Sequence, residues 1–256
     1  GGMLLNGIPS FRLEKDIIEA EIDVLRQMGV EFKYNIEIGK DTTIPSLRSE
    51  GYKAFYIAIG AQGGRKTGVP GEDANGVQTG VEFLRKANNE ALRHALEGDV
   101  VVIGGGNVAV DVARTAVRLT EGKVTMLCLE SEKEMPAAAD EVLEVKEEDI
   151  SVMNGWGPKE ILTENGNVKA VVFKKCLSVK DADGKFNPQY DENETITVPC
   201  KNVLLSIGQS IEWGKLLEGT KVELNRNNTA KADPVTLQTA DPDIFVGGDV
   251  YTGPRF

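Results

Sequence analysis

The sequence predicts an α/β fold built around parallel β-strands, and three observations carry this prediction. A glycine triplet at 104–106 stands between an apolar strand and a helical segment. Apolar strands that run into glycine recur along the chain. A stretch rich in β-branched residues, 168–179, adds an antiparallel β excursion. The 256 residues suffice for one large or two modest domains.

The N-terminal part of the chain predicts helices and strands in alternation. Ile18, Ile22 and Leu25 share one face of the segment 14–28, as in an amphipathic helix, and Gly29 is the expected stop. The other elements expected here are a half-buried strand of alternating residues over 30–38, a short helix over 43–50, and a strand over 54–59 that is covered on both faces.

The middle of the chain predicts a βαβ unit. Residues 62–78 are dense in Gly and Pro, which predicts a boundary between domains. Beyond this boundary the expected elements are a helix over about 79–97, a strand over 99–103, a helix over 107–120 and a strand over 124–129. A right-handed crossover makes two such strands parallel.

The remainder predicts one more helix and several strands. The expected elements are a helix over 138–149, a β-rich stretch over 168–179, a polar exposed loop over 181–195, an alternating strand over 194–198, and short strands over 203–207 and 244–246. We expect solvated side chains for the acidic run 141–149, for Arg114 and for Arg118.

Four apolar strands end in a glycine turn and form a weak internal repeat. These turns lie at Gly60, Gly104, Gly208 and Gly247 with Gly248. In open α/β sheets, ligands lie just beyond the carboxyl ends of the strands. The repeat therefore predicts two dinucleotide sites rather than one.

The turn after the strand 99–103 matches the dinucleotide-binding pattern G-x-G-x-x-A. Gly104 permits the tight turn, Gly106 lets the backbone approach a pyrophosphate, and Ala109 lets the helix pack on the strand. The phosphates would meet the helix N-terminus, where free N–H groups favour anions. The candidate binding residues are Gly104, Gly105, Gly106, Asn107, Val108 and Ala109.

The end of the next strand bears on the choice of coenzyme. Glu130 and Ser131 stand there, where an acidic side chain hydrogen-bonds the adenosine ribose and a basic one receives a 2′-phosphate. Carboxylates repel a 2′-phosphate, so the sequence predicts NAD in preference to NADP. A solvated acidic loop is the alternative, and Lys133 leaves a phosphate contact open.

Composition excludes several classes of function. The net charge of −11 and the pI near 4.8 provide no basic field for nucleic acid. No apolar window is long enough to span a membrane and no signal pattern opens the chain, so we expect a cytoplasmic protein.

Metal and dithiol chemistry lack a sequence anchor. Cys128, Cys176 and Cys200 are widely spaced, and His94 is the only histidine. We therefore assign no metal ligand and no catalytic residue, and expect a cofactor to carry any chemistry.

Eight motifs together resemble a known family. They lie at 1–4, 7–13, 57–61, 69–73, 104–111, 134–137, 206–209 and 248–254. They occur in the order seen in the glutamate synthase small (beta) subunit and its relatives. The resemblance implies two interleaved Rossmann-like domains, in which an NAD(P)-binding domain over 67–235 interrupts a partial FAD-binding domain over 1–66 and 236–256.

The resemblance also implies an activity. Hydride would pass from NAD(P)H to FAD, without an acid–base residue, and electrons would continue to iron–sulfur centres or a partner subunit of the full-length protein. Along the FAD it implies Gly2, Met3, Leu4 and Arg12, with Ile38 near the adenine, Gly60 at the hinge, and Gly248 with Asp249 at the pyrophosphate and ribityl chain. Gly60 and Gly208 would lie close to the crossings between domains.

Measured against the family pattern, the chain is expected to be a fragment. The opening FAD-binding βαβ unit and the helix after the final Gly-Pro are missing, so FAD is expected of the full-length protein. Leu129 and Glu130 stand where NADPH-using relatives show arginines. The alternatives are a methyltransferase that binds S-adenosylmethionine and an interaction module with a vestigial nucleotide site.

Overall fold

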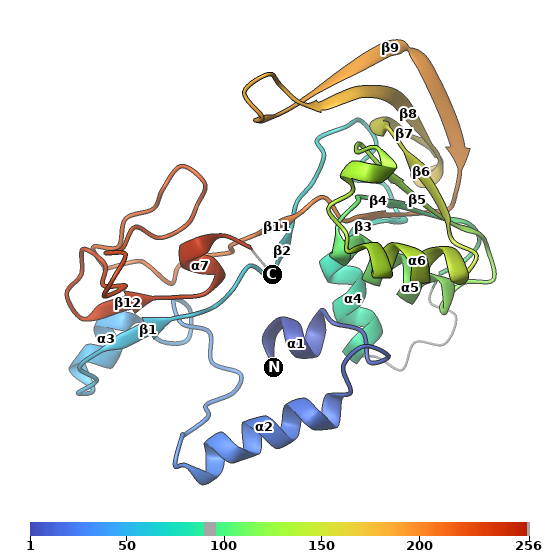
Figure 1. The fold of residues 1–256 in the computed structure, drawn as a ribbon. Helices are drawn as coiled ribbons and strands as arrows, with labels where there is room; N and C mark the ends of the chain where they lie inside the picture. Colours follow the sequence, from blue (N-terminus) through green and yellow to red (C-terminus); the bar gives the residue numbers. More distant parts are fainter. Residues whose placement is uncertain (90–95, 255–256) are drawn as a thin grey trace. The chain divides into compact units, whose positions relative to one another are not determined.

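The computed structural model describes residues 1–89 and 96–254, which form two compact units (Figure 1). Unit 1 holds Gly1–Leu5, Ser10–Gly63 and the chain from Gln209 onward, and unit 2 holds Asn6–Pro9 and Gly64–Gly208. The chain thus leaves unit 1, builds most of unit 2 and returns. Ile211 and Trp213 join the hydrophobic core of unit 1, so the return lies at 208/209 rather than at the expected 235/236.

Unit 2 is built on a five-stranded parallel sheet with strand order β3-β10-β4-β5-β6. Its strands are β3 (Val77–Thr79), β4 (Val100–Ile103), β5 (Val124–Cys128), β6 (Ser151–Asn154) and β10 (Asn202–Leu205). Val100 pairs with Val124 across β4 and β5, so the predicted parallel βαβ unit is confirmed.

Both faces of this sheet are covered, which explains the continuous apolar run in β4. Val100 and Val102 face a core shared with the helices, whereas Val101 and Ile103 face a core shared with an antiparallel sheet. The helices are α4 (Gly80–Asn89), α5 (Asn107–Val117) and α6 (Ala139–Glu147) (Figure 1).

The predicted antiparallel excursion is a three-stranded sheet with order β7-β8-β9. Its strands are β7 (Trp156–Glu164), β8 (Asn167–Lys180) and β9 (Phe186–Pro199). The loop expected over 181–195 is wrong, because β9 already begins at Phe186 and pairs with β8 despite its polar composition, although most of these residues are exposed as expected. Ion pairs such as Lys174–Glu192 support these polar strand residues.

Unit 1 centres on β1 (Phe55–Ile57) and β12 (Ile244–Val246), which pair in parallel. Its helices are α1 (Gly2–Asn6, whose last residue belongs to unit 2), α2 (Lys15–Gln27), α3 (Ile44–Ser49) and α7 (Asp249–Thr252). Ile57, Ile244 and Val246 form the centre of its core. The short strands β2 (Gly63–Gly64) and β11 (Gln209–Ser210) pair where the chain changes units.

The strand expected over 30–38 is wrong. The segment is extended but forms no ladder, and only Ile38 makes an isolated bridge, to Thr42. Tyr34 is 62% exposed. An alternating pattern becomes a strand only where a partner strand lies alongside, and no described strand does so here. The strand β1 does pair, with β12, but the expected cover on both faces is wrong, since Tyr56 is exposed.

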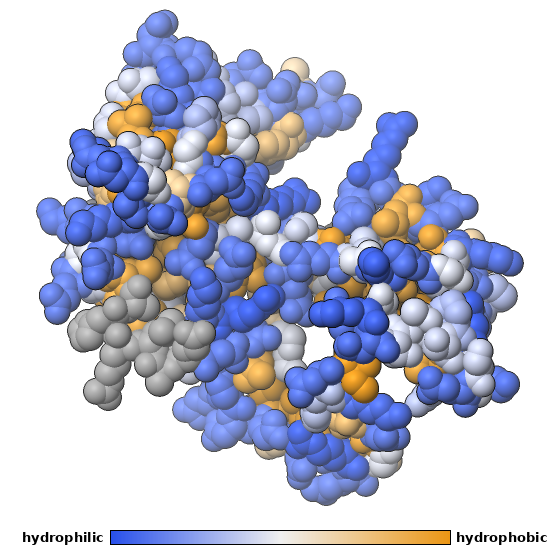
Figure 2. Space-filling model, turned by 180° about the vertical axis from the view of Figure 1, so that it is seen from behind, coloured by the Kyte–Doolittle hydropathy of each residue, from blue (hydrophilic) through white to orange (hydrophobic). Residues whose placement is uncertain are grey.

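The helix predicted over 14–28 is confirmed as α2, and Gly29 follows it with φ +91°. Only Ile18 of its apolar face is buried, whereas Leu25 is exposed. The face of the molecule in Figure 2 is mostly hydrophilic with hydrophobic patches between. Of the helix expected over about 79–97, α4 is observed, and His94 lies outside the described residues.

The solvated state expected for Arg114, Arg118 and the acidic run 141–149 is wrong for Arg114 and Glu141, whereas Arg118 and most of the acidic run are exposed. Arg114 is 12% exposed and forms ion pairs with Glu144 and, at 2.7 Å, with Glu148. Arg118 also pairs with Glu148, and Glu141 is buried. The network fastens α5 to α6.

Among the described residues no helix has the length and apolarity needed to cross a membrane.

Candidate functional site

The glycine turn that follows β4 is held between its two neighbouring strands. The N–H of Gly104 donates to Leu127 O at 2.9 Å, and the N–H of Ser206 donates to Ile103 O at 2.7 Å. Gly104 has φ +146°, and a Cβ on it would overlap the backbone of Ser206. Only glycine fits this position, because both the backbone angle and the close approach exclude a side chain.

The next two glycines have opposite surroundings. A Cβ on Gly105 would lie 2.9 Å from Cys128 Cβ and 3.0 Å from Glu130 Oε2. A Cβ on Gly106 would meet nothing within 4 Å. One side of the turn is therefore packed against the end of β5, and the other is open.

The open side presents backbone N–H groups. Within the described ranges no hydrogen bond is recorded for the N–H of Gly105, Gly106, Asn107 or Val108, which lead into α5. The N–H of Ala109 donates to Gly106 O at 2.9 Å. Unsatisfied N–H groups at the positive end of a helix attract anions such as phosphate.

The other polar groups of this turn are occupied by the segment after β5. Gly105 O accepts from the N–H of Ala137 at 3.0 Å, and Asn107 Oδ1 accepts from the N–H of Ala138 at 2.9 Å. Ala109 is fully buried, which fits its predicted role in packing α5 on β4. The carbonyls and side chains are thus tied down, while the N–H groups stay available.

Glu130 stands at the end of β5 with its backbone fixed. Its carbonyl oxygen accepts from Asn154 Nδ2 at 3.2 Å, from Gly155 N at 3.1 Å and from Cys128 Sγ at 3.6 Å. Burial raises the pKa of the Cys128 thiol to about 12, so the thiol stays protonated and acts as a donor. The Glu130 side chain is half-buried and its Oε2 lies on the packed side of the glycine turn.

The next residues on this loop, Ser131 and Lys133, differ in their surroundings. Ser131, which precedes the 3₁₀ helix η1 (Glu132–Glu134), donates from Oγ to Glu134 Oε2 at 2.5 Å. Lys133 is exposed. The structure therefore brings Glu130 to the glycine turn and engages Ser131 locally.

In unit 1, the ends of β1 and β12 bring three sequence-predicted residues together. A Cβ on Gly60, which has φ +69°, would lie 3.9 Å from Asp249 Oδ2. Gly248 precedes α7 with φ +66° and ψ −149°, and a Cβ on it would meet nothing within 4 Å. This strand-end turn is again open on one side. Tyr251 and Thr252, which follow in α7, line a cavity of about 460 Å³.

The remaining residues predicted for this site are placed differently. Ile38 packs against the core around β1 and β12. None of Gly2, Met3, Leu4 and Arg12 belongs to that core. The carbonyl of Leu4 accepts from Lys15 Nζ at 3.1 Å, so α1 is tied to the start of α2.

Gly208 is the last residue of the segment Gly64–Gly208 of unit 2. It has φ +119°, and its carbonyl accepts from the N–H of Arg65 at 3.1 Å. A Cβ on Gly208 would lie 3.4 Å from Arg65 Cδ. The hydrogen bond between Arg65 and Gly208 thus joins the segment in which the chain enters unit 2 to the segment in which it leaves.

Sequence reasoning missed several residues around Glu130. Asn154 and Gly155 come from the end of β6, which was not predicted because its apolar run is short. A Cβ on Gly157 would lie 2.8 Å from Leu129 Cδ2 and 2.5 Å from Tyr190 Cε1, so β7 and β9 also reach this point. Recognition of β6 in the sequence would have placed Asn154 and Gly155 at the end of a strand in this sheet.

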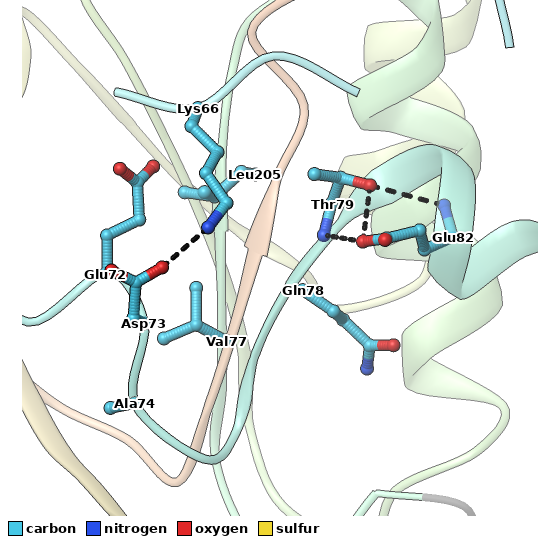
Figure 3. A pocket seen from close by; sticks show the side chains of 9 residues that line it. All are labelled: Lys66, Glu72, Asp73, Ala74, Val77, Gln78, Thr79, Glu82 and Leu205. Carbon is cyan, nitrogen blue, oxygen red and sulfur yellow. Dashed lines mark hydrogen bonds and ion pairs between the residues drawn. The ribbon is translucent and has the colours of Figure 1, made fainter. Parts of the chain in front are cut away.

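A separate cavity of about 210 Å³ lies beside β3 in unit 2 (Figure 3). Lys66 points into it and forms an ion pair with Asp73 at 2.6 Å. Glu82 caps α4 by accepting from Thr79 N and Oγ1 at 3.0 and 2.7 Å. The carboxylates that line this cavity are paired with donors of the protein, and the lining does not favour phosphate. Among the described residues no group of three His, Cys, Asp or Glu side chains could hold a metal ion.

Comparison with known proteins gives a family match over most of the chain. A family model described as pyridine nucleotide-disulphide oxidoreductase matches residues 16–256. The NADP(+)-dependent formate dehydrogenase subunit beta of Moorella thermoacetica is 37% identical over the whole chain, which spans 36% of that protein. The glutamate synthase (NADPH) small chain of Halomonas elongata is 32% identical over 99% of the chain, which spans 56% of that protein.

A solved structure gives the fold. FprA of Mycobacterium tuberculosis in complex with NADPH matches with a TM-score of 0.80 and 18% identity, over 100% of this chain and 70% of that one. The likeness confirms the predicted α/β fold with Rossmann-like domains. The predicted resemblance to glutamate synthase small subunits is likewise confirmed.

Proposed function

Because the chain belongs to the pyridine nucleotide-disulphide oxidoreductase family, we propose that it forms part of a flavin-dependent enzyme that takes hydride from NAD(P)H. One observation carries this proposal. The turn 104–106 presents N–H groups without protein partners on its open side, at the N-terminus of α5. This arrangement is suited to a pyrophosphate.

Unit 2, with Asn6–Pro9 and Gly64–Gly208, is the proposed NAD(P)-binding domain, in place of the range 67–235 expected from the sequence. The N–H groups of 105–108 bind the pyrophosphate, and the absence of a side chain at Gly106 lets it approach. Gly104 and Ala109 act indirectly, since they fix the turn and the packing of α5. Glu130, with Ser131 beside it, faces the adenosine ribose.

For the coenzyme we propose a preference for NADH over NADPH. The Glu130 carboxylate lies beside the glycine turn, where it can accept from a ribose hydroxyl and repels a 2′-phosphate. The relatives compared above carry NADP(+) or NADPH in their names, so this preference rests on Glu130 alone.

Unit 1 is the proposed FAD-binding part, in the full-length protein. Gly60, Gly248 and Asp249 meet at the ends of β1 and β12, and the free space at Gly248 fits a cofactor that lies against the backbone. Gly2, Met3, Leu4, Arg12 and Ile38 are proposed to line the same cofactor. FAD, when bound, accepts the hydride and releases electrons singly. The residues of this chain bind the cofactor and orient it.

The electron acceptor lies outside this chain in the proposal. The two relatives are named as a dehydrogenase subunit and a synthase small chain, and the chain spans about a third to a little over half of them. We propose an iron–sulfur domain or a partner subunit as acceptor. The three cysteines are free and buried, which favours a reducing compartment, and we place the protein in the cytoplasm.

Calorimetric titration with NADH, NADPH, FAD and S-adenosylmethionine tests the proposal. We expect NADH to bind more tightly than NADPH, and S-adenosylmethionine not to bind. Binding of S-adenosylmethionine alone would favour the methyltransferase alternative, for which the family match gives no support. Failure to bind either nicotinamide dinucleotide would contradict the proposal and favour the vestigial interaction module.

A further inference from the structure

The backbone carbonyl of Glu130 receives an unusual number of donors for a residue at a strand end. Cys128 Sγ, Asn154 Nδ2 and Gly155 N all point to this one oxygen, and we call these donors the Glu130 clamp. A carbonyl has two lone pairs, so three donors saturate it. The peptide that carries the Glu130 side chain is thereby fixed.

Asn154 is the central member of the clamp. It stands opposite Cys128 in the β5–β6 register, and its Nδ2 lies 3.2 Å from both Cys128 Sγ and Glu130 O. Its side chain is half-buried. The side-chain amide of Asn154 therefore bridges Cys128, the last residue of β5, and Glu130, which lies two residues further along the chain.

The clamp is itself anchored in the antiparallel sheet. Gly155 donates to Glu130 O, and its own carbonyl accepts from the N–H of Cys176 in β8 at 2.8 Å. Gly155 has φ +76°, and its N–H points to the residue Glu130 after β5 while its carbonyl points to β8. Strand β8 therefore helps to fix the position of Glu130 through the hydrogen bonds of Gly155.

We propose that Asn154 is a positioning residue for coenzyme choice, acting through Glu130 rather than by touching the coenzyme. This inference rests on the proposed function, because it requires a dinucleotide at the glycine turn. Three rotatable bonds place the oxygens of a glutamate carboxylate, so the carboxylate discriminates between a hydroxyl and a phosphate only where its backbone is held. The antiparallel sheet thus contributes to the specificity of a site built on the parallel sheet.

A double-mutant cycle tests the inference. The ratio of the NADPH and NADH dissociation constants is measured by calorimetry for the wild type, Asn154→Ala, Glu130→Ala and the double variant. Loss of one hydrogen bond that holds the carboxylate should lower the ratio by about fivefold in Asn154→Ala. In the Glu130→Ala background the same change should alter the ratio by less than about twofold, because the residue through which it acts is gone.

Asn167→Ala is the matched control. Asn167 Nδ2 donates to Asn165 O at 3.2 Å in the exposed turn between β7 and β8, so the variant removes an amide–carbonyl bond of the same kind elsewhere in unit 2. We expect the ratio to stay at the wild-type value. Should Asn154→Ala fail to fold, Cys128→Ala removes another donor of the clamp and carries the same test.

Hydrogen exchange adds a readout that needs no ligand. The Gly155 amide should exchange faster in Asn154→Ala than in the wild type or in Asn167→Ala, because its acceptor is loosened. An unchanged ratio, an equal loss of affinity for both coenzymes, or the same effect without Glu130 would each overturn the inference. A wild type that binds neither dinucleotide would instead overturn the proposed function.

Discussion

Gly104 and Ser206, from two different strand ends, lie in backbone contact in unit 2. A Cβ on Gly104 would overlap the Ser206 carbonyl, while the N–H of Ser206 donates to Ile103 O at 2.7 Å. The end of β10 therefore presses on the glycine turn from one side. The turn cannot retreat from a ligand that approaches its open side, and its shape is fixed before binding.

Replacement of Gly104 by alanine should destabilise unit 2. The residue has φ +146°, and its Cβ would meet Ser206 backbone atoms that cannot move without distorting β10. Strain and overpacking together should cost about 3 kcal/mol or more of unfolding free energy. Chemical denaturation measures this, and a variant as stable as the wild type would show that the turn is less confined than described.

Replacement of Gly106 by alanine should have the opposite character. Its φ of −95° suits any residue and its Cβ would face open space, so stability should change by less than about 1 kcal/mol. The added methyl group enters the space proposed for the pyrophosphate. Affinity for NADH should therefore fall about tenfold or more in calorimetry, and undiminished affinity would show that the phosphates bind elsewhere.

Glu130→Arg should raise the affinity for NADPH relative to NADH. The change replaces a carboxylate beside the turn by a group that pairs with a 2′-phosphate. The ratio of the two dissociation constants should shift by about tenfold or more. Glu121→Arg makes the same change of charge in the exposed loop before β5, and should leave the ratio unchanged. An equal effect of both variants would mean that only net charge matters.

Removal of Arg48 should destabilise unit 1 in a pH-dependent way. Arg48 Nε and Nη2 bind Asp243 at 2.7 Å, and the guanidinium lowers the pKa of that carboxyl. A lowered pKa gives stability that is fully present above the unfolded value near 3.9 and is lost as the pH falls through the folded value. Arg48→Met should therefore lower the midpoint of thermal unfolding by a few degrees at pH 7.

The same experiment at a pH below the lowered pKa of Asp243 supplies the control. There the wild type loses its advantage, since Asp243 becomes protonated, and the two unfolding midpoints should converge. A difference that persists unchanged at acid pH would show that Arg48 stabilises unit 1 by packing against Phe55, over which its guanidinium lies, and not by charge.

Local patterns predicted the centre of the molecule, and long-range contacts account for what they missed. β4, α5 and β5 follow from an apolar run, a glycine turn and a helical period within thirty residues. The contact of Gly104 with Ser206 and the clamp on Glu130 join segments far apart in sequence, for which no local signal exists. These contacts set the geometry of the site.

The mistaken elements have one physical cause. The segment 30–38 has the pattern of a strand and lacks a neighbour, whereas the polar segment from Phe186 lacks the pattern and is a strand because β8 lies beside it. Strand formation depends on pairing more than on composition. The prediction of the glycine turn 104–106 depends least on strand pairing, because its glycines act through the shape of the backbone.

The most direct test of the account is a titration of ¹⁵N-labelled protein with NADH, followed by the chemical shifts of assigned backbone amides. The account predicts the largest shifts at the N–H groups of Gly105, Gly106, Asn107 and Val108, with a smaller shift at Glu130. Saturable shifts elsewhere that leave these four amides unmoved, or no shifts at all, would contradict it.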